Sequence, residues 1–257
     1  MTLLTQIILY TAASGILSLA GGFILLGNTA WVKKFSIHFV SFAAGALLAI
    51  SFLDLLPEAI EHGQEAGEIE VHTILLAAFA GFIAFFLLEK LITQFHYHHH
   101  EHDEQHQHAT PALLMIGDGF HNFIDGVAIA ATFLVDPSLG LITAIGVAAH
   151  ELPQEIGDFS ILLHHGWSKS ATLWANILIS LTSVVGAIVA YSLRDSIEPY
   201  LPHLLAVTAG IFIYIASADL LPEITTRTKK DKSWHVILLV FLGIAAVWLM
   251  RSFVEGH

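Results

Sequence analysis

The sequence predicts an all-α integral membrane protein with eight transmembrane helices. Its mean hydropathy of +0.71 and hydrophobic fraction of 55% exceed those of soluble globular domains, and only 12% of the residues are charged. Apolar runs of about 20 residues, long enough to cross a bilayer as helices, recur along the chain. The 257 residues hold about eight such runs with short connections. We therefore expect a single transmembrane domain over residues 1–257.

The first three runs are predicted at about residues 4–26, 36–56 and 71–91. No basic residue precedes the first run, as one would in a secretory signal, so we predict a retained first span. An acidic loop is expected between the second and third runs, where it would concentrate cations. Its carboxylates are Glu58, Glu61, Glu65, Glu68 and Glu70.

A histidine-rich stretch, QFHYHHHEHDEQHQH, follows the third run and contains seven histidines between His96 and His108. It lacks the hydrophobicity needed to fold, so residues of about 92–110 are predicted to form a disordered loop. Such a loop is more typical of metal buffering or sensing than of a transport step.

The remaining five runs are predicted at about residues 111–134, 139–163, 170–193, 201–221 and 234–253. Asp136 and Pro137 mark a short turn between the fourth and fifth runs, so these two helices are expected to be neighbours.

The basic residues predict the orientation. With eight spans, eight of the ten Lys and Arg residues fall on one side of the membrane, and Arg194 and Arg251 fall on the other. The eight are Lys33, Lys34, Lys90, Lys169, Arg227, Lys229, Lys230 and Lys232. Because cytoplasmic loops are rich in Lys and Arg, both termini are predicted outside and the histidine-rich loop in the cytosol. We expect a multi-pass protein of a bacterial plasma membrane.

The segment DLLPE occurs twice, at residues 54–58 and 219–223. Each copy follows a glycine, Gly45 or Gly210, after eight residues. The copies lie on the second and seventh runs, so they point in opposite directions through the membrane. This arrangement predicts the inverted repeat that many secondary transporters carry. The alternative is that DLLPE is merely a polar helix end that tolerates proline.

The fourth and fifth runs contain the most polar residues, in HNFID (residues 121–125) and HELPQEIGD (residues 150–158). On an ideal helix, with His121 at zero, Asp125, Asp118 and Asn122 fall at about 40°, 60° and 100°. With His150 at zero, Gln154, Asp158, Glu151 and Glu155 fall at about 40°, 80°, 100° and 140°. Each helix therefore presents one polar face.

Ionisable groups in the membrane interior are costly unless paired, so two such faces require a compensating partner. A divalent cation would be one. The sequence has no cysteine, which leaves imidazole, carboxylate and amide ligands, and these suit Zn²⁺, Fe²⁺, Mn²⁺ or Cd²⁺. The alternative is a hydrogen-bonded network that only locks the two helices together.

These motifs, the histidine-rich loop before them and the eight spans resemble the ZIP (Zrt/Irt-like protein) family of divalent metal transporters. The resemblance implies a one- or two-metal transport site, with zinc foremost as the substrate, and no cofactor. Its ligands would be His121, Asn122, Asp125, His150, Glu151 and Gln154. The resemblance also implies a three-two-three helix arrangement, a homodimer and metal movement toward the cytosol. The similar branch reads HExPHEIGD, whereas this sequence has Gln154 in place of the second histidine.

Further residues are predicted to line the ion pathway. Asp118, Glu155 and Asp158 extend the two polar faces, and solvated helix ends are the alternative interpretation. His164 and His165 lie at the predicted cytosolic end of the fifth helix, where an exit site and a plain interfacial position are the two interpretations. Asp54 and Glu58 lie at the outer end of the second helix, where they are expected to form an entrance.

Two other functions compete with transport. HELPQ resembles an HExxH metalloprotease motif whose second histidine is replaced by Gln154, and a metal sensor without flux would rest on the histidine-rich loop alone. The sequence has no GxxxxGK[ST] phosphate-binding loop, which argues against primary pumping, and its net charge of −12 argues against nucleic-acid binding. We therefore predict a secondary transporter rather than an enzyme.

Overall fold

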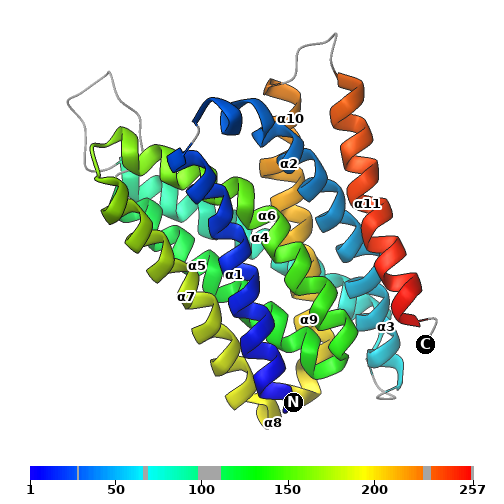
Figure 1. Ribbon diagram of the computed structural model, residues 1–257. Helices are drawn as coiled ribbons and strands as arrows, with labels where there is room; N and C mark the ends of the chain where they lie inside the picture. The colour runs from blue at the N-terminus through cyan, green and yellow to red at the C-terminus, as the bar shows by residue number, and fades with distance from the viewer. Residues whose placement is uncertain (28, 66–68, 98–110, 228–232, 256–257) are drawn as a thin grey trace.

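The computed structural model describes residues 1–27, 29–65, 69–97, 111–227 and 233–255. These residues form a bundle of helices, and no strand occurs among them (Figure 1). The α-helices are α1 (Leu3–Gly27), α2 (Thr29–Ala49), α3 (Leu56–Glu65), α4 (Val71–Tyr97), α5 (Pro111–Val135), α6 (Pro137–His164), α7 (Lys169–Ser192), α8 (Arg194–Ile197), α9 (Leu201–Tyr214), α10 (Leu221–Arg227) and α11 (Ser233–Glu255). Two π-helices, η1 (Ile50–Leu55) and η3 (Ile215–Leu220), and one 3₁₀-helix, η2 (Glu198–Tyr200), complete the described chain.

Six segments of the described chain are long and apolar enough to cross a membrane. They are Leu3–Gly27, Phe35–Gln64, Val71–Leu91, Lys169–Ser192, Arg194–Thr226 and Trp234–Ser252. The prediction of an all-α, multi-pass membrane protein is therefore confirmed. The helices α5 and α6, which were expected to be the fourth and fifth spans, are not among the six. They carry the polar side chains of the predicted metal site, which lower their hydropathy.

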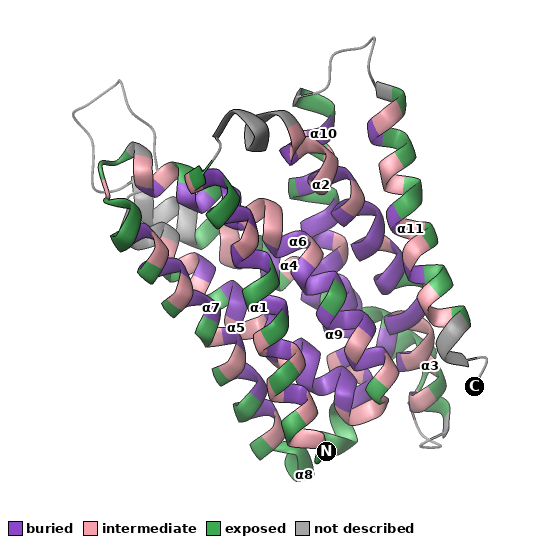
Figure 2. Ribbon diagram, viewed as in Figure 1, coloured by how far each residue is buried: buried purple, intermediate pink, exposed green. Residues whose placement is uncertain are grey.

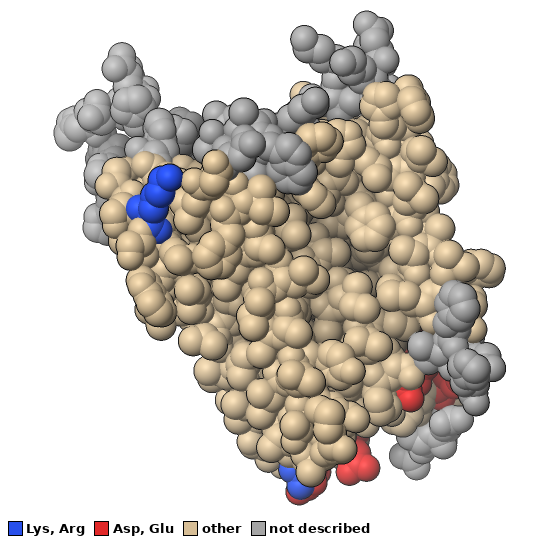
Figure 3. Space-filling model, viewed as in Figure 1, with Lys and Arg blue, Asp and Glu red and all other residues tan. Residues whose placement is uncertain are grey.

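The surface of the bundle is apolar in its middle part. Phe79, Trp174 and Phe241 are each more than 60% exposed, and they lie on three different helices. Buried residues concentrate on the inner faces of the bundle, as Figure 2 shows. On the face seen in Figure 3, the visible charged side chains lie near the two ends of the molecule. A soluble protein rarely exposes so much apolar surface, whereas a lipid-facing surface has this composition.

Two observed boundaries differ from the predicted ones. The acidic segment after the second run is largely helical, because α2, η1 and α3 continue without a break from Thr29 to Glu65. The third span also extends further than expected, since α4 reaches Tyr97 and includes the first residues of the predicted loop. The rest of that loop, residues 98–110, lies outside the described residues.

The turn between α5 and α6 forms as the sequence predicts. One carboxylate oxygen of Asp136 accepts hydrogen bonds from the backbone N–H groups of Ser138 and Leu139, at 2.8 and 3.1 Å. This is an N-cap, and Pro137 occupies the first turn, where its missing N–H is not needed. Because the connection is this short, α5 and α6 lie antiparallel and side by side (Figure 1). The helix α6 then continues through Pro153 to His164.

The long helices form two groups. In the first, α1 and α5 each pack on both α6 and α7; in the second, α2 packs on α11 and α4 packs on α9. The groups meet mainly where α6 contacts α2 and where α9 contacts α5. The start of α1 and the end of α11 lie at the same end of the bundle (Figure 1).

The two DLLPE copies share an unusual backbone conformation. Each copy begins within a six-residue π-helix: η1 ends just before Leu56 and η3 ends just before Leu221. The aspartate of each copy is the fifth residue of its π-helix. A π-helix is rare and commonly lies at a functional position within an α-helix. The sequence repeat is therefore also a repeat of local structure.

The glycines before these copies also occupy equivalent positions. A Cβ on Gly45 would lie 2.0 Å from the carbonyl oxygen of Val240 in α11, and one on Gly243 would lie 2.2 Å from that of Phe42 in α2. A Cβ on Gly210 would lie 1.9 Å from the carbonyl oxygen of Ala78 in α4, and one on Gly81 would lie 2.3 Å from that of Val207 in α9. Reciprocal glycine pairs therefore bring α2 against α11 and α9 against α4 at backbone distance, as small residues do between membrane helices.

Candidate metal centre

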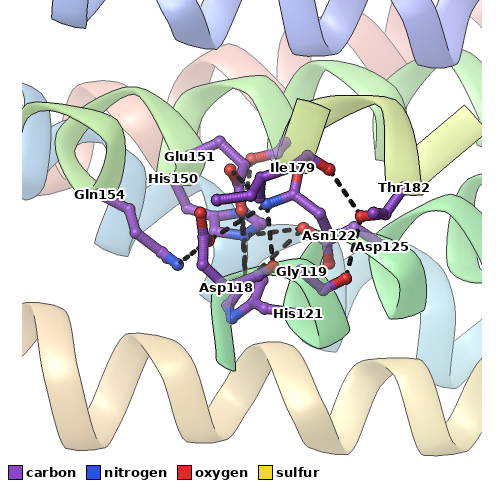
Figure 4. A network of polar contacts seen from close by, with 11 residues as sticks. Asp118, Gly119, His121, Asn122, Asp125, His150, Glu151, Gln154, Ile179 and Thr182 are labelled. Carbon is purple, nitrogen blue, oxygen red and sulfur yellow. Dashed lines mark hydrogen bonds and ion pairs between the residues drawn. The ribbon is translucent and has the colours of Figure 1, made fainter. Parts of the chain in front are cut away.

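The polar faces of α5 and α6 meet in the interior of the bundle. His121 and Asp125 lie one turn apart on α5, and His150 and Glu151 are adjacent on α6. Their side chains converge in the space between the two helices (Figure 4). The four residues are between 1% and 9% exposed. The face geometry that the sequence predicts therefore brings these four side chains together.

Each of the four residues offers one ligand atom to this cluster, and these atoms all lie within 4.8 Å of one another. The Nε2 atoms of His121 and His150 are 3.1 Å apart. Oδ2 of Asp125 lies 3.2 Å from Nε2 of His150 and 3.6 Å from Nε2 of His121. Oε1 of Glu151 lies 3.5 Å from Nε2 of His121 and 3.7 Å from Nε2 of His150.

These distances match the spacing of ligands around a small cation. Zinc binds imidazole nitrogen and carboxylate oxygen at about 2.0–2.2 Å in tetrahedral geometry, so its ligand atoms lie roughly 3.3–3.6 Å from one another. The nitrogen–oxygen distances of the cluster, from 3.2 to 3.7 Å, fall on or close to this range. Two nitrogen and two oxygen donors are an appropriate set for a borderline metal ion without thiolate.

Two carboxylate oxygens of the cluster accept no hydrogen bond. Oδ2 of Asp125 and Oε1 of Glu151 are buried and have no donor within hydrogen-bonding geometry. Both are the atoms that face the two imidazoles. Buried carboxylate oxygens without a partner are costly, and a bound cation removes that cost.

The ring of His150 is oriented by the backbone of its own helix. Its Nδ1 lies 3.2 Å from the carbonyl oxygen of Gly146, one turn earlier. If Nδ1 carries the proton and donates to that carbonyl, Nε2 presents its lone pair to the cluster, which is the tautomer that a metal requires. The second helix group places an aromatic ring against each imidazole. The ring of Phe85 lies edge-on to that of His121, with centroids 5.2 Å apart, and the centroids of Phe212 and His150 are 5.8 Å apart.

Asn122 and Gln154 lie beside the cluster. Nδ2 of Asn122 donates to Oε2 of Glu151 at 3.3 Å and to Oδ1 of Asp118 at 3.2 Å. Nε2 of Gln154 donates to the same Oδ1 of Asp118 at 2.9 Å. The two amides therefore connect Glu151 with Asp118, and Gln154 reaches the polar face of α5 (Figure 4).

The other predicted pathway residues lie in different places. Asp118, Glu155 and Asp158 are buried next to the cluster. Asp54 is also buried, but it lies in η1 and pairs with Arg251 of α11 at 3.6 Å.

Glu58 lies in α3, partly buried and away from the cluster. His165 is exposed at the end of α6, where its ring contacts the carbonyl oxygen of Ile161, and the side chain of His164 lies outside the described part.

Sequence reasoning missed the residues that surround the ligands. Phe85, Phe212 and the carbonyl of Gly146 contact the two imidazoles, and Arg251 pairs with Asp54. Aromatic residues are common in membrane helices, so no local pattern distinguishes the two phenylalanines. Arg251 could have been singled out from the sequence, because it is the single basic residue near the end of the last apolar run.

Comparison with known proteins decides the family. The family model described as ZIP Zinc transporter matches residues 3–113 and 98–251. The chain belongs to the ZIP zinc transporter family. The match covers nearly the whole ZIP chain, including both motif helices. Because members of this family are transporters, the metalloprotease interpretation of HELPQ is set aside.

Individual relatives agree with this assignment. Zinc transporter ZIP13 of Pongo abelii is 31% identical over 235 residues, which are 88% of this ZIP chain and 69% of that relative. Zinc transporter foi of Drosophila melanogaster is 36% identical over 144 residues, and zinc transporter ZIP4 of Homo sapiens is 38% identical over 138 residues. These last two matches cover 56% and 54% of this chain but only 20% and 21% of the relatives.

Proposed function

We propose that this protein transports divalent metal cations across the membrane toward the cytosol, with zinc as the foremost substrate and iron, manganese and cadmium as candidates. The ion is bound by His121, Asn122, Asp125, His150, Glu151 and Gln154. One observation supports this most strongly: two imidazole nitrogens and two carboxylate oxygens converge within 4.8 Å inside the bundle. Family membership and the names of the relatives point to the same substrate.

The proposed topology has eight spans. We add α5 and α6 to the six apolar segments, because each is long enough to span and their polar residues turn inward. The resemblance to the family adds the three-two-three arrangement and the homodimer. The repeated π-helices and the reciprocal glycine pairs support an inverted repeat. The bias of basic residues supports external termini, and we propose a bacterial plasma membrane as the location.

The proposed mechanism is alternating access between two helix groups. All six proposed ligands come from α5 and α6, within the first group. The second group contributes Phe85 and Phe212, which cover the imidazoles without binding metal. Movement of the first group against the second would therefore carry the bound ion past an apolar wall and expose it to one side at a time. No ATP-binding motif occurs in the sequence, so the ion moves downhill or is coupled to another ion.

Uptake by reconstituted vesicles tests this proposal. Purified protein in vesicles should accumulate Zn²⁺ in a saturable manner, and competition by Cd²⁺, Fe²⁺ and Mn²⁺ would rank the substrates. We expect His121→Ala, Asp125→Ala and His150→Ala each to lower uptake by about 100-fold or more. Loss of a residue that only hydrogen-bonds to a metal ligand already lowers metal affinity or activity by about 10–100-fold, and these variants remove the ligand itself.

The matched control is His72→Ala, since His72 is an exposed histidine at the start of α4, away from the cluster. It should transport like the parent protein. Near-normal uptake by all three cluster variants would show that the ion does not pass through this site. Metal binding without any uptake by the parent protein would instead support a sensor.

A further inference from the structure

We propose that Arg251 is a tethered cation at the outer end of the bundle. Its guanidinium occupies the position at which Asp54 and the backbone carbonyl of Leu53 would otherwise retain a metal ion. Arg251 is thus a positioning residue that allows ions to pass the entrance without stopping there. The inference rests on the proposed function, which defines the outer end and the direction of transport.

One nitrogen atom of Arg251 contacts two oxygen atoms of η1. Its Nη1 lies 3.6 Å from Oδ1 of Asp54 and also donates a hydrogen bond to the carbonyl oxygen of Leu53. In an α-helix that carbonyl would accept from the N–H of residue 57, but residue 57 is a proline and has none. A single positive centre therefore lies between a carboxylate and a backbone carbonyl, which are also the oxygen donors that hard cations prefer.

The buried charge of Asp54 requires a positive partner. Its side chain is 4% exposed, whereas that of Arg251 is 35% exposed. A buried carboxylate in a membrane-spanning segment is costly unless a positive charge compensates it. Arg251 supplies this charge from a half-buried position, so Asp54 is compensated before any ion arrives.

The pair lies where the two helix groups meet at the outer end. Glu58 of α3 is close enough to interact electrostatically with Arg251 and also with Asp136. Asp136 caps α6 at the turn between α5 and α6, so it belongs to the first group. Without the guanidinium, Asp54, Glu58 and Asp136 would present three carboxylates to an entering ion. An ion bound among them would move on slowly.

The sequence repeat shows that this backbone conformation does not require an arginine. Arg251 lies eight residues after Gly243, and Glu89 lies eight residues after Gly81. Because these glycines occupy equivalent positions in the two close helix pairs, Glu89 is the counterpart of Arg251. The second copy has the same π-helix and the same proline, Pro222. Support of the helix therefore does not account for Arg251.

The two copies consequently carry opposite charges at equivalent positions. Glu89 accepts a hydrogen bond from the hydroxyl of Tyr214 and is close enough to Asp219 to interact electrostatically. The next residue, Lys90, also interacts electrostatically with Asp219, but it is exposed and its Nζ lies 5.8 Å from the centre of the Phe86 ring. The arginine is therefore a feature of the outer copy.

Manganese binding to the purified full-length protein tests the proposal without depending on transport. The protein is given one equivalent of Zn²⁺, and bound Mn²⁺, which prefers oxygen donors, is counted from the loss of the free Mn²⁺ signal in electron paramagnetic resonance. Arg251→Gln should bind one more Mn²⁺ than the parent protein, because it frees two oxygen donors and removes a positive charge. Arg251→Lys keeps the charge, and Asp54→Asn/Arg251→Gln lacks the carboxylate, so each should bind the same number as the parent protein.

Uptake kinetics test the consequence for transport. In Arg251→Gln the maximal rate and the Zn²⁺ concentration for half-maximal uptake should both fall by about tenfold, because an ion retained at the entrance binds tightly and leaves slowly. Asp54→Asn/Arg251→Gln should recover most of the maximal rate. A variant that is merely less stable would transport less without a lower half-maximal concentration.

Arg194→Gln is the matched control, because Arg194 is another arginine on the outer side and pairs at the surface with Asp195. It should bind and transport like the parent protein. The visible spectrum of Co²⁺ bound by His121 and His150 checks that each variant is folded. If Arg251→Gln does not fold, Asp54→Asn decides. It should bind as many Mn²⁺ ions as the parent protein, in which the guanidinium keeps metal away from Asp54.

Equal Mn²⁺ binding and equal uptake kinetics in Arg251→Gln and the parent protein would overturn the proposal, because Asp54 would then retain no ion without the arginine. One Mn²⁺ fewer in Asp54→Asn than in the parent protein would also overturn it, because a metal ion would then bind beside the guanidinium. Neither result would affect the proposed function, which fails if the variants at the four-residue cluster transport normally.

Discussion

At the scale of single residues, the metal centre depends on a few side-chain directions. Helix periodicity alone puts His121 with Asp125 and His150 with Gln154 on common faces, so these groupings could be predicted from the sequence. The contact of Gln154 with Asp118 could not be predicted, because it depends on the register between two helices. The hydrogen bond of His150 to Gly146 depends on a rotamer and was likewise inaccessible.

Position 154 offers a direct test of the ligand set. Gln154→His introduces an imidazole one turn after His150, facing Asp118 and the polar face of α5. An imidazole nitrogen binds Zn²⁺ better than an amide oxygen does, so the apparent Zn²⁺ affinity should rise by about tenfold relative to Mn²⁺. Maximal flux should fall, because a tightly held ion leaves slowly. Uptake titrations with both metals measure each effect.

The same variant should acquire a steeper pH dependence. An imidazole binds metal only when it is neutral, and its ordinary pKa is about 6.5. As the pH falls below about 6.5, protonation competes with Zn²⁺ at one more ligand in Gln154→His than in the parent protein. Gln64→His, which adds a histidine at an exposed position, is the matched control. An unchanged metal preference and pH profile in Gln154→His would mean that position 154 does not contact the ion.

At the scale of helices, the sequence predicts existence and type better than boundaries. Long apolar runs specify the membrane helices, because a segment in lipid has to satisfy its backbone N–H and C=O groups with hydrogen bonds of its own. The helical continuation from α2 through η1 to α3 was not predicted, since its acidic residues resemble a loop. The π-helices were also not predicted, because no composition signal distinguishes them from α-helix.

The close helix pairs lead to a stability prediction. A Cβ at position 210 would lie 1.9 Å from the carbonyl oxygen of Ala78, so Gly210→Ala should force α9 away from α4. Overpacking of this kind costs about 1–3 kcal/mol. The temperature of unfolding in detergent should therefore fall.

Gly157→Ala provides the comparison, since nothing lies within 4 Å of a Cβ at that exposed position of α6. Alanine favours the helix more than glycine does, so this variant should unfold at the same temperature as the parent protein or slightly higher. Equal unfolding temperatures for Gly210→Ala and the parent protein would argue against the close packing of α4 and α9.

At the scale of the whole molecule, the family and the membrane location follow from the sequence, because composition and two specific motifs determine them. The arrangement of the helices into two groups could not be predicted, since it depends on which small residues face each other across the bundle. The reciprocal pairs formed by Gly45 with Gly243 and by Gly81 with Gly210 became evident only in three dimensions.

The eight-span topology predicts opposite accessibility for two positions. Gln64 lies near the end of α3, and Ser170 lies in the first turn of α7, at the other end of the bundle. The protein has no native cysteine, so Gln64→Cys and Ser170→Cys can each be labelled specifically. An impermeant thiol reagent added to intact cells should modify Gln64→Cys but not Ser170→Cys. Modification of both, or of Ser170→Cys alone, would contradict the proposed orientation.

The most direct test of the metal centre is zinc X-ray absorption on the purified protein loaded with one equivalent of Zn²⁺. The geometry of the four-residue cluster predicts two imidazole nitrogens and two carboxylate oxygens around the ion at about 2.0–2.2 Å, and the amides of Asn122 and Gln154 are the remaining proposed ligands. In His121→Ala/His150→Ala the imidazole scattering should disappear, although the histidines at positions 98–108 are still present. An unchanged imidazole signal in that variant, or a shell without imidazole in the parent protein, would contradict the assignment of the ion to this site.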